Sequence, residues 1–527
     1  MTLGGTRPAG IDSSDARSVA VIDLGSNSWR LVVFGYGAGW WRRTDELYEN
    51  VRIGAGLGES GRLGDEAISR GLETLTVFAH FCEAHGLEPD DVHVVATSAI
   101  RDASNREEFV RAGEDRSGLK IEVLSEDAEA WLGYLAAVNT STLADGAVLE
   151  IGGGSLQLIR VAGRQAYERP SFSLGAVRLT EELMPGPGPT RKRELEAVRV
   201  RAASLLVHQR WLGADSGAPG RLVGLGGAVR NLATAAMRDA GFPDLGVQGF
   251  VLTRKVLAKL IRELAGLPVN ERKSVSGIKP GREDIILAAA LVIESVVKLG
   301  GFDGVEVTEA GLREGVFFAR TLFADRDGRN PVFADVRRSA VTNLAIQYES
   351  DMAHVEHVAR LSLQMFDSLT EQGVIQPLTG ERELLWAGAM LHDVGMTIAY
   401  DDHHKHSQYL ILSGELPGFD PRERALIACI ARYHRKGIPK LGELAPVAQP
   451  DDEDLIARCA VIVRLAEHLE RGRDQTVSRA LLRSDGDGIQ LDVSAPGESV
   501  ALQHWSVDRY GDGETFARVF GRKLMIA

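Results

Sequence analysis

The stretch Val19-Ala20-Val21-Ile22-Asp23-Leu24-Gly25-Ser26-Asn27-Ser28 decides the fold prediction. Its apolar run predicts a buried strand that ends in a polar turn, and Trp29 to Phe34 predicts a returning strand. The pattern recurs at Gly146-Ala147-Val148-Leu149-Glu150-Ile151-Gly152-Gly153-Gly154-Ser155, followed by a return from Leu156 to Val161. Two hairpins whose first strand ends in an acid predict two similar α/β lobes that face one another.

The remaining chain predicts further domains. A length of 527 residues favours three or four domains. Residues 335–480 show helical periodicity and most of the histidines, and a Gly- and Asp-containing stretch at 324–332 predicts a linker before them. The predicted organisation is a disordered tail at 1–17, lobe I at 18–140, lobe II at 141–323, a helical domain at 335–480 and a small α/β domain at 481–527.

Composition restricts the partners. The formal net charge of −13 opposes long-range attraction of DNA or RNA, so a polyanion would have to be held by local clusters of arginine and lysine. Only three cysteines occur, without metal or disulfide spacing, which favours a reducing compartment. Residues 1–18 show no signal peptide, and the longest apolar run, Ile285 to Val297, is too short for a membrane span. We therefore expect a cytoplasmic protein with no nucleic-acid or membrane partner.

The two hairpin turns predict phosphate binding. Glycines at a strand-to-strand turn let backbone N–H groups approach a phosphate, and the hydroxyl and amide side chains beside them add donors. The acids that end the strands, Asp23 and Glu150, are placed to hold a hydrated Mg²⁺. The alternative is two ordinary hairpin turns. The predicted phosphate-binding residues are Gly25, Ser26, Asn27, Ser28, Gly152, Gly153, Gly154 and Ser155, with Gly226 and Gly227 from a third glycine cluster before a helix.

Together with Thr97-Ser98-Ala99-Ile100-Arg101-Asp102-Ala103-Ser104-Asn105 and Gly311-Leu312-Arg313-Glu314-Gly315, these turns resemble the exopolyphosphatase and guanosine pentaphosphate phosphatase family. The resemblance implies the actin-like fold of the sugar kinases and heat-shock ATPases, Mg²⁺ or Mn²⁺ as cofactor, and a homodimer. Within the similar segment Ser125 to Leu132 it implies Glu129 as the catalytic carboxylate. It also implies Arg101 as a phosphate clamp, and Arg178 is a further candidate for phosphate contact.

Two positions depart from the family pattern. Glu150 stands where Asp is usual, and Gln157 stands where Glu is usual. Both changes fall where the metal is expected, so one alternative is a catalytically weakened regulatory protein that binds polyphosphate or an alarmone without cutting it.

The helical domain resembles HD-type metal phosphohydrolases. The similar ligand order comprises His354, His392, Asp393, His403, His404, His406, His434 and Glu467, with Asp474 nearby. It suggests a second metal site at His354, His392, Asp393, His434 and Glu467, with His357 as an alternative first ligand. Imidazoles and a shared carboxylate hold one or two divalent ions in such sites. One alternative is a scaffold without metal whose basic stretch, 422–440, binds polyphosphate. Another is that this domain is itself the active phosphodiesterase.

The resemblance and the residues together predict an exopolyphosphatase. Water oriented by Glu129 would attack the terminal phosphorus of inorganic polyphosphate, and the extra domains would lengthen the binding channel. Guanosine pentaphosphate 5′-phosphohydrolase activity is the alternative within the same chemistry.

Overall fold

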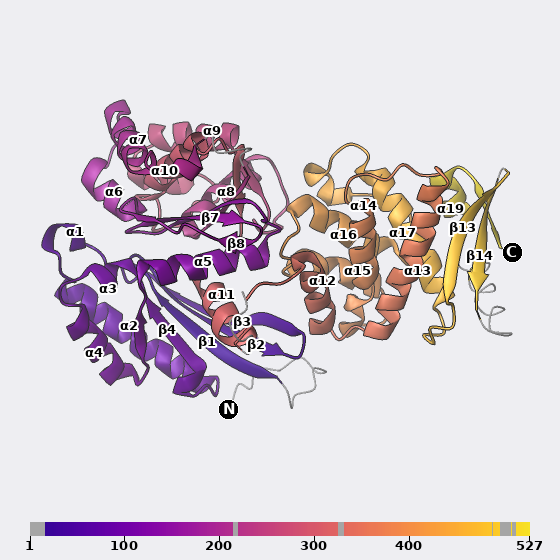
Figure 1. Cartoon of the computed structure of the whole chain (residues 1–527), viewed down its shortest axis with the longest axis horizontal. Coiled ribbons are helices and arrows are strands. Elements are labelled where there is room, and N and C mark those ends of the chain that lie inside the picture. Colours follow the sequence, from indigo (N-terminus) through magenta and orange to yellow (C-terminus); the bar gives the residue numbers. More distant parts are fainter. Residues whose placement is uncertain are drawn as a thin grey trace.

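The computed structural model describes residues 16–213, 220–324, 331–486, 488–495, 507 and 513–526. The chain forms an elongated molecule (Figure 1). Two α/β lobes lie at one end, a helical domain follows, and a small sheet lies at the far end. The predicted architecture of an actin-like two-lobed domain followed by a helical domain is confirmed.

The first sheet carries the first predicted hairpin. Its strand order is β3-β2-β1-β4-β5. Strands β1 and β2 pair antiparallel with Asp23 opposite Arg30, so the acid lies at the strand end beside the turn. Strand β3 was not predicted, because half of its residues are charged and half of its positions are exposed. The strands are β1 (Arg17–Leu24), β2 (Trp29–Gly37), β3 (Trp40–Glu49), β4 (Val92–Ala96) and β5 (Ile121–Val123).

Helices cover this sheet and connect it to the second lobe. Trp29, Leu75, Phe78 and Phe109 are buried in the core between the sheet and its helices. Helix α5 runs between the two lobes (Figure 1) and is buried along most of its length. The helices are α1 (Leu57–Ser60), α2 (Asp65–Ala84), α3 (Ser98–Asp102), α4 (Arg106–Ser117) and α5 (Glu126–Thr140).

The second sheet repeats the hairpin. Its order is β11-β12-β10-β6-β7-β8, with β9 paired to β7, and Glu150 lies opposite Gln157. Its strands are β6 (Gly146–Ile151), β7 (Leu156–Ala162), β8 (Gln165–Ala166), β9 (Ser171–Phe172), β10 (Arg221–Leu225), β11 (Val251–Thr253) and β12 (Gly304–Val307). Its helices are α6 (Ala176–Leu183), α7 (Lys192–Leu206), α8 (Gly227–Asp239), α9 (Arg254–Gly266) and α10 (Ile286–Leu299), of which α10 is almost wholly apolar and buried.

Helix α11 (Leu312–Phe317) ties the second lobe back to the first. Phe317 is fully buried and stacks on Phe34 of β2, with ring centroids 4.4 Å apart. Trp41 of β3 packs against the same ring at 5.6 Å. This aromatic contact fixes the lobe that carries Gly311 to Gly315 against the sheet that carries Asp23.

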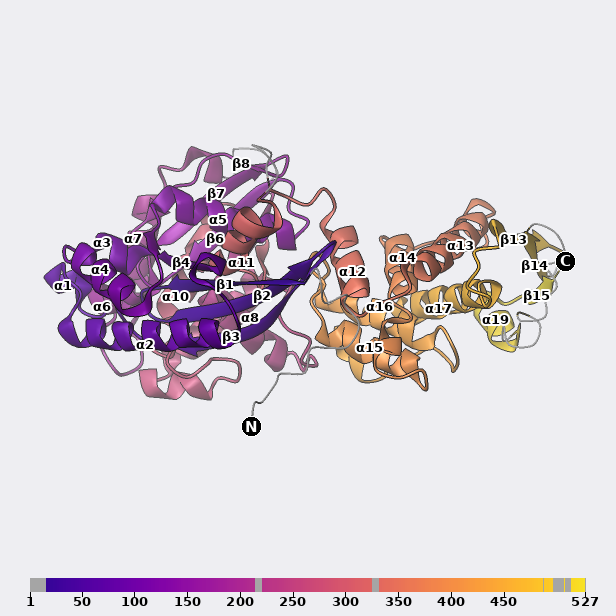
Figure 2. The ribbon, with the colours of Figure 1, turned by 90° about the horizontal axis from the view of Figure 1, so that it is seen from below.

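The helical domain joins the lobes at β3. Asn343 on α12 accepts a hydrogen bond from the Trp41 backbone N–H at 2.8 Å, and Gln347 donates one to the Trp41 carbonyl at 2.8 Å. Figure 2 shows α12 at this junction. The helices are α12 (Val336–Gln347), α13 (Met352–Glu371), α14 (Glu381–Met390), α15 (His403–Ser413), α16 (Pro421–Tyr433) and α17 (Asp452–Leu469).

A three-stranded sheet of β13 (Arg479–Asp485), β14 (Gly488–Ser494) and β15 (Lys523–Ile526) with α19 (Gly513–Phe520) completes the fold. A strand predicted at 499–505, nearly all of the predicted tail at 1–17, and most of the predicted linker lie outside the described residues. The predicted domain boundaries stay predictions. In the described ranges, the structure contains no helix that is both long enough and apolar enough to span a bilayer.

Replacing Phe317 with alanine should destabilise the chain by about 3–5 kcal/mol, because the change leaves a cavity in an aromatic cluster. The measurement is chemical denaturation of the purified variant. Val77→Ala is the control, since Val77 is 56% exposed. Equal stability of the two variants would contradict the role of Phe317 in joining the lobes.

Candidate active site

The two predicted loops meet in one cavity. The β1–β2 turn and the β6–β7 turn line a cavity of about 140 Å³. A Cβ built on Gly153 of the second turn would lie 3.2 Å from the Cβ of Ser26 in the first turn, and one built on Gly154 would lie 2.7 Å from the Oγ of Ser98 on α3. The turns approach so closely that glycine is favoured there. The predicted loop residues on the cavity wall are Gly25, Ser26, Asn27, Ser28, Gly152, Gly153 and Ser155.

Helix α6 supports the second turn from behind. The backbone N–H groups of Ala176 and Val177 donate to the carbonyls of Gly152 and Gly153, both at 2.9 Å. A Cβ on Gly175 would collide with the backbone of Gly153 and Gly154. The carbonyls of the turn are thus engaged by the helix, which fixes the shape of the loop.

Glu129 lies at the start of α5, on the cavity wall. Ser125 caps the helix by accepting a hydrogen bond from the Ala128 N–H at 3.2 Å, which places Glu129 in the first turn. Arg101 donates to the Glu129 Oε2 at 2.6 Å and to the Leu124 carbonyl at 3.1 Å. Burial raises the pKa of the Glu129 carboxyl, although the hydrogen bond and charge of Arg101 oppose the shift. A buried carboxylate with a raised pKa suits a general base.

Arg101 reaches Glu129 from beside the cavity and is not among the residues that line it. The side chain is only 11% exposed. Its Nε and Nη2 are buried without a hydrogen-bond partner in the described part of the chain. The guanidinium therefore positions Glu129 through Nη1, while its Nε and Nη2 face the carboxylates of Asp102 and Glu126 at 3.6 and 3.9 Å.

Three carboxylates crowd the cavity. Asp23 and Glu150 end β1 and β6, and both line the cavity with Glu129. Burial raises the pKa of Asp23 against the opposing charge of Arg313, whose Nη1 lies 3.8 Å from the Asp23 Oδ2. Burial and the neighbouring carboxylates raise the pKa of Glu150 to about 8. The Glu150 Oε2 is buried without a hydrogen-bond partner in the described residues. A bound cation would relieve this repulsion.

The surroundings of Glu150 and Gln157 accommodate both departures from the family pattern. A Cβ on Gly133 of α5 would collide with the Glu150 Oε2, so the absence of a side chain at Gly133 makes room for the longer acid. Gln157 is 1% exposed and donates to the Ser155 Oγ at 2.9 Å. This neutral amide supports the loop without adding another buried negative charge.

Several arginines at the cavity were not predicted as site residues. Arg30, Arg230, Arg282 and Arg313 line it. Burial, together with repulsion from Arg30 and Arg313, lowers the pKa of Arg230 to about 10. The quoted motif Gly311 to Gly315 contained Arg313, but no spacing in the sequence marks the other three. Crowded cations of this kind are stabilised by a bound anion.

The remaining residues predicted to contact phosphate lie in two different cavities. Gly226 and Gly227 line the same cavity, and Gly226 has a φ of 95°, a conformation that favours glycine. Arg178 and Gly154 instead line a neighbouring cavity of about 680 Å³. Arg178 donates to the Gly154 carbonyl at 3.3 Å, so it supports the loop from the side of α6.

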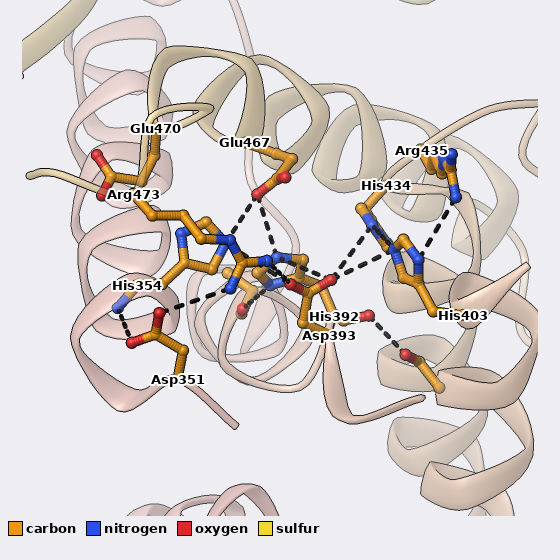
Figure 3. Close-up of polar contacts among 12 residues, drawn as sticks. Asp351, His354, His392, Asp393, His403, His434, Arg435, Glu467, Glu470 and Arg473 are labelled. Carbon is orange, nitrogen blue, oxygen red and sulfur yellow. Dashed lines mark hydrogen bonds and ion pairs between the residues drawn. The ribbon is translucent and has the colours of Figure 1, made fainter. Parts of the chain in front are cut away.

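The predicted residues of the helical domain also converge (Figure 3). The His354 Nε2 lies 3.0 Å and the His392 Nε2 3.3 Å from the Glu467 Oε2. Asp393 lies 3.6 Å from His392, 3.9 Å from His434 and 3.3 Å from His403. His357 faces Glu470 at 3.4 Å instead. His354 is therefore the residue that the fold brings to the cluster.

Comparison with known proteins identifies the family. A family model described as the Ppx/GppA phosphatase family matches residues 38–322, and one for domain III of the same family matches residues 336–506. The chain belongs to the Ppx/GppA phosphatase family. It is a hydrolase of phosphoanhydride bonds, and phosphatases of this family generally depend on a divalent metal.

Individual relatives agree with this assignment. The chain is 26% identical over 487 residues to a guanosine-5′-triphosphate,3′-diphosphate pyrophosphatase of Vibrio vulnificus, covering 90% of this chain and 92% of the relative. It is 27% identical to the Aquifex aeolicus member of the Ppx/GppA family, with a TM-score of 0.52, covering 59% of this chain and 99% of the other. An exopolyphosphatase of Cytophaga hutchinsonii shares the fold at 23% identity and a TM-score of 0.54, covering 60% of this chain and all of its own.

Replacing Gly175 with alanine should lower kcat/KM for phosphate release by about 10²-fold, because a displaced loop misplaces the substrate. Gly188→Ala is the matched control, since nothing lies within 4 Å of a Cβ at Gly188. Unchanged kinetics of the Gly175 variant, with the fold checked by circular dichroism, would mean that this loop does not hold substrate.

Proposed function

We propose that the protein is an exopolyphosphatase that removes the terminal phosphate of inorganic polyphosphate. The observation that carries the proposal is the junction of three features in one cavity. These are the two glycine-containing turns, the buried carboxylate Glu129, and the cluster of arginines. Positioning and charge stabilisation of this kind are what phosphoryl transfer requires.

The donor set suits a hard divalent cation. Asp23 and Glu150 would hold Mg²⁺, or Mn²⁺ in its place, because both offer buried carboxylate oxygens and the Glu150 Oε2 has no hydrogen-bond partner in the described residues. When bound, the ion supplies positive charge that offsets the charge on the phosphate oxygens.

Glu129 orients the attacking water and accepts its proton. The water oxygen forms a bond to the terminal phosphorus while the bond from that phosphorus to the bridging oxygen breaks. The bridging oxygen keeps the electron pair, so the products are orthophosphate and a polyphosphate shorter by one unit. Arg101 holds Glu129 in place, and its Nε and Nη2 would have to turn from Asp102 and Glu126 to reach oxygens of the transferred phosphate.

The arginines extend away from the cavity along a path for the remaining chain. A wider cavity of about 460 Å³ shares Arg30, Gly227 and Arg230 with the first and continues to Arg238 and Lys279. Burial and the charges of Arg30 and Arg230 lower the pKa of Lys279. A row of mutually repelling cations suits an extended polyanion, even though the whole chain is negatively charged.

Guanosine pentaphosphate is the second candidate substrate. The wider cavity also presents Met237, Phe242 and Val247, so an apolar surface suited to a base lies beside the cations. The relative from Vibrio vulnificus is named for a guanosine substrate. The predicted homodimer and cytoplasmic location stay predictions.

Replacing Glu129 with glutamine should reduce turnover about 10²- to 10⁴-fold while leaving polyphosphate binding largely intact, as expected for loss of a general base. Phosphate release with Mg²⁺ is measured on polyphosphate and guanosine pentaphosphate in parallel. Glu126→Gln is the control, because its side chain on the same helical turn is 59% exposed. Full turnover in the Glu129 variant would remove its catalytic role, and binding without release in the native chain would favour the regulatory alternative.

Replacing Lys279 with methionine tests the path of the chain. We expect the KM for long-chain polyphosphate to rise about fivefold, because an exposed charge interaction is worth up to about 1 kcal/mol. The KM for tripolyphosphate should change less, since Lys279 lines the wider cavity and not the first one. Lys273→Met, a nearby exposed lysine outside both cavities, is the control. Equal effects on long and short chains would refute this path.

A further inference from the structure

Arg230 of α8 lines both the catalytic cavity and the wider cavity that continues from it. Its Nη1 donates to the backbone carbonyl of Glu309 at 2.5 Å. A carbonyl is a neutral acceptor, so this hydrogen bond directs the guanidinium and leaves its positive charge available to a phosphate. The position of the Glu309 backbone therefore helps to set the direction in which Arg230 points.

Glu309 follows β12 and is held by the loop between α8 and β11. Its N–H donates to the Oε1 of Gln248 at 3.0 Å, and its own Oε1 accepts from the Val247 N–H at 2.8 Å. A Cβ on Gly246 would collide with the Glu309 Oε1, so the loop lies directly against this carboxylate. The carbonyl that directs Arg230 thus belongs to a residue whose amide and side chain are both fixed by the loop.

The side chain of Gln248 links this loop to α5. Its Oε1 accepts from the Thr308 Oγ1 at 3.1 Å as well as from Glu309, while its Nε2 donates to the Thr140 carbonyl at 2.7 Å. A neutral carboxamide supplies both the acceptor and the donor that these groups require. Gln248 is 7% exposed, and the cavity at this junction measures about 20 Å³, which leaves the amide little space to turn.

The helical domain packs directly against this link, at the end of α5 that lies on its side of the molecule (Figure 1). The Gly418 N–H donates to the same Thr140 carbonyl at 3.0 Å. Gly249 has a φ of 73°, and a Cβ there would lie 2.8 Å from the carbonyl oxygen of Phe419. The turn between α15 and α16 therefore contacts both the acceptor of the Gln248 amide and the residue that follows Gln248.

We propose that Gln248 is a positioning residue for Arg230 in the phosphatase reaction, and that the turn of the helical domain at 418–420 holds Gln248 in place. The proposal rests on the proposed function in one respect, namely that Arg230 contacts the phosphates of the substrate. The helical domain then acts on the phosphatase cavity itself, besides lengthening the binding channel. A glutamine that only satisfied backbone groups would stabilise the fold without acting through Arg230.

A double-mutant cycle on the full chain separates these two roles. Gln248→Met should lower kcat/KM for phosphate release about 10- to 100-fold, because a displaced guanidinium misplaces the substrate. In the Arg230→Met background the same change should alter kcat/KM by less than about twofold, since the residue through which Gln248 acts is gone. An equal loss in both backgrounds, or no loss in the native background, would overturn the proposal.

Gln364→Met is the matched control for loss of a glutamine hydrogen bond. The Gln364 Oε1 also accepts a backbone N–H at 3.0 Å, that of Ala480, but this bond joins α13 to β13, away from the lobes. The control should leave kcat/KM unchanged, and thermal denaturation of each variant checks its fold. A loss of kcat/KM in Gln364→Met as large as that in Gln248→Met would contradict a role that acts through Arg230.

Gly249→Ala supplies the same cycle if Gln248→Met does not fold, because the new methyl group meets Phe419 and leaves the amide of Gln248 intact. Its loss of kcat/KM should again disappear in the Arg230→Met background, and an equal loss in both would overturn the proposal. The cycle is measured on polyphosphate and on guanosine pentaphosphate. If the native chain releases phosphate from neither, the cycle is measured on the Kd for polyphosphate, so failure of the proposed function is distinguished from failure of this proposal.

Discussion

The ion pair between Arg101 and Glu129 is the interaction on which the phosphatase site depends. It joins α3, at the end of β4, to α5, the helix that runs between the lobes. Without Arg101, burial alone would favour the protonated form of Glu129, which cannot act as a base. With Arg101 in place, a buried carboxylate is held at the meeting point of two strand-turn units.

The same principle of balanced charge extends across the cleft. The carboxylates of Asp23, Glu129 and Glu150 repel one another, and so do the guanidinium groups of Arg30, Arg230 and Arg313. The repulsion within each set is reduced when an ion of the opposite charge binds there. A divalent cation suits the carboxylates and a polyanion suits the arginines. A metal–polyphosphate complex carries charges of both signs, so it would offset the repulsion within both sets.

Much of the site could be predicted from the sequence, because contiguous sequence motifs determine where many of its residues lie. Strand, acid and glycine turn are contiguous, so the positions of Asp23 and Glu150 at the cavity followed from the hairpins. Glu129 and Arg101 required a family resemblance, because a first-turn carboxylate and a single arginine have no distinctive spacing. Arg30 and Arg230 were missed, since only the closed arrangement of both lobes brings them together.

Packing between elements far apart in the sequence also determines side-chain pairings that residue spacing alone did not predict. His354 and His357 lie on neighbouring faces of α13, and only the docking of α17 directs His354 to Glu467 and His357 to Glu470. Similarly, the space that Gly133 leaves for Glu150 depends on the contact of α5 with β6. The fold class could be predicted from the local hydrophobic periodicity. These side-chain pairings could not, because they depend on tertiary packing.

The most direct measurement is a crystal structure of the Glu129→Gln variant with Mg²⁺ and a short polyphosphate. We predict the terminal phosphate between the turns at Gly25–Ser28 and Gly152–Ser155, with Mg²⁺ against Asp23 and Glu150 and the chain leading toward Arg230 and Lys279. Polyphosphate bound only elsewhere, such as against the helical domain, would contradict the account.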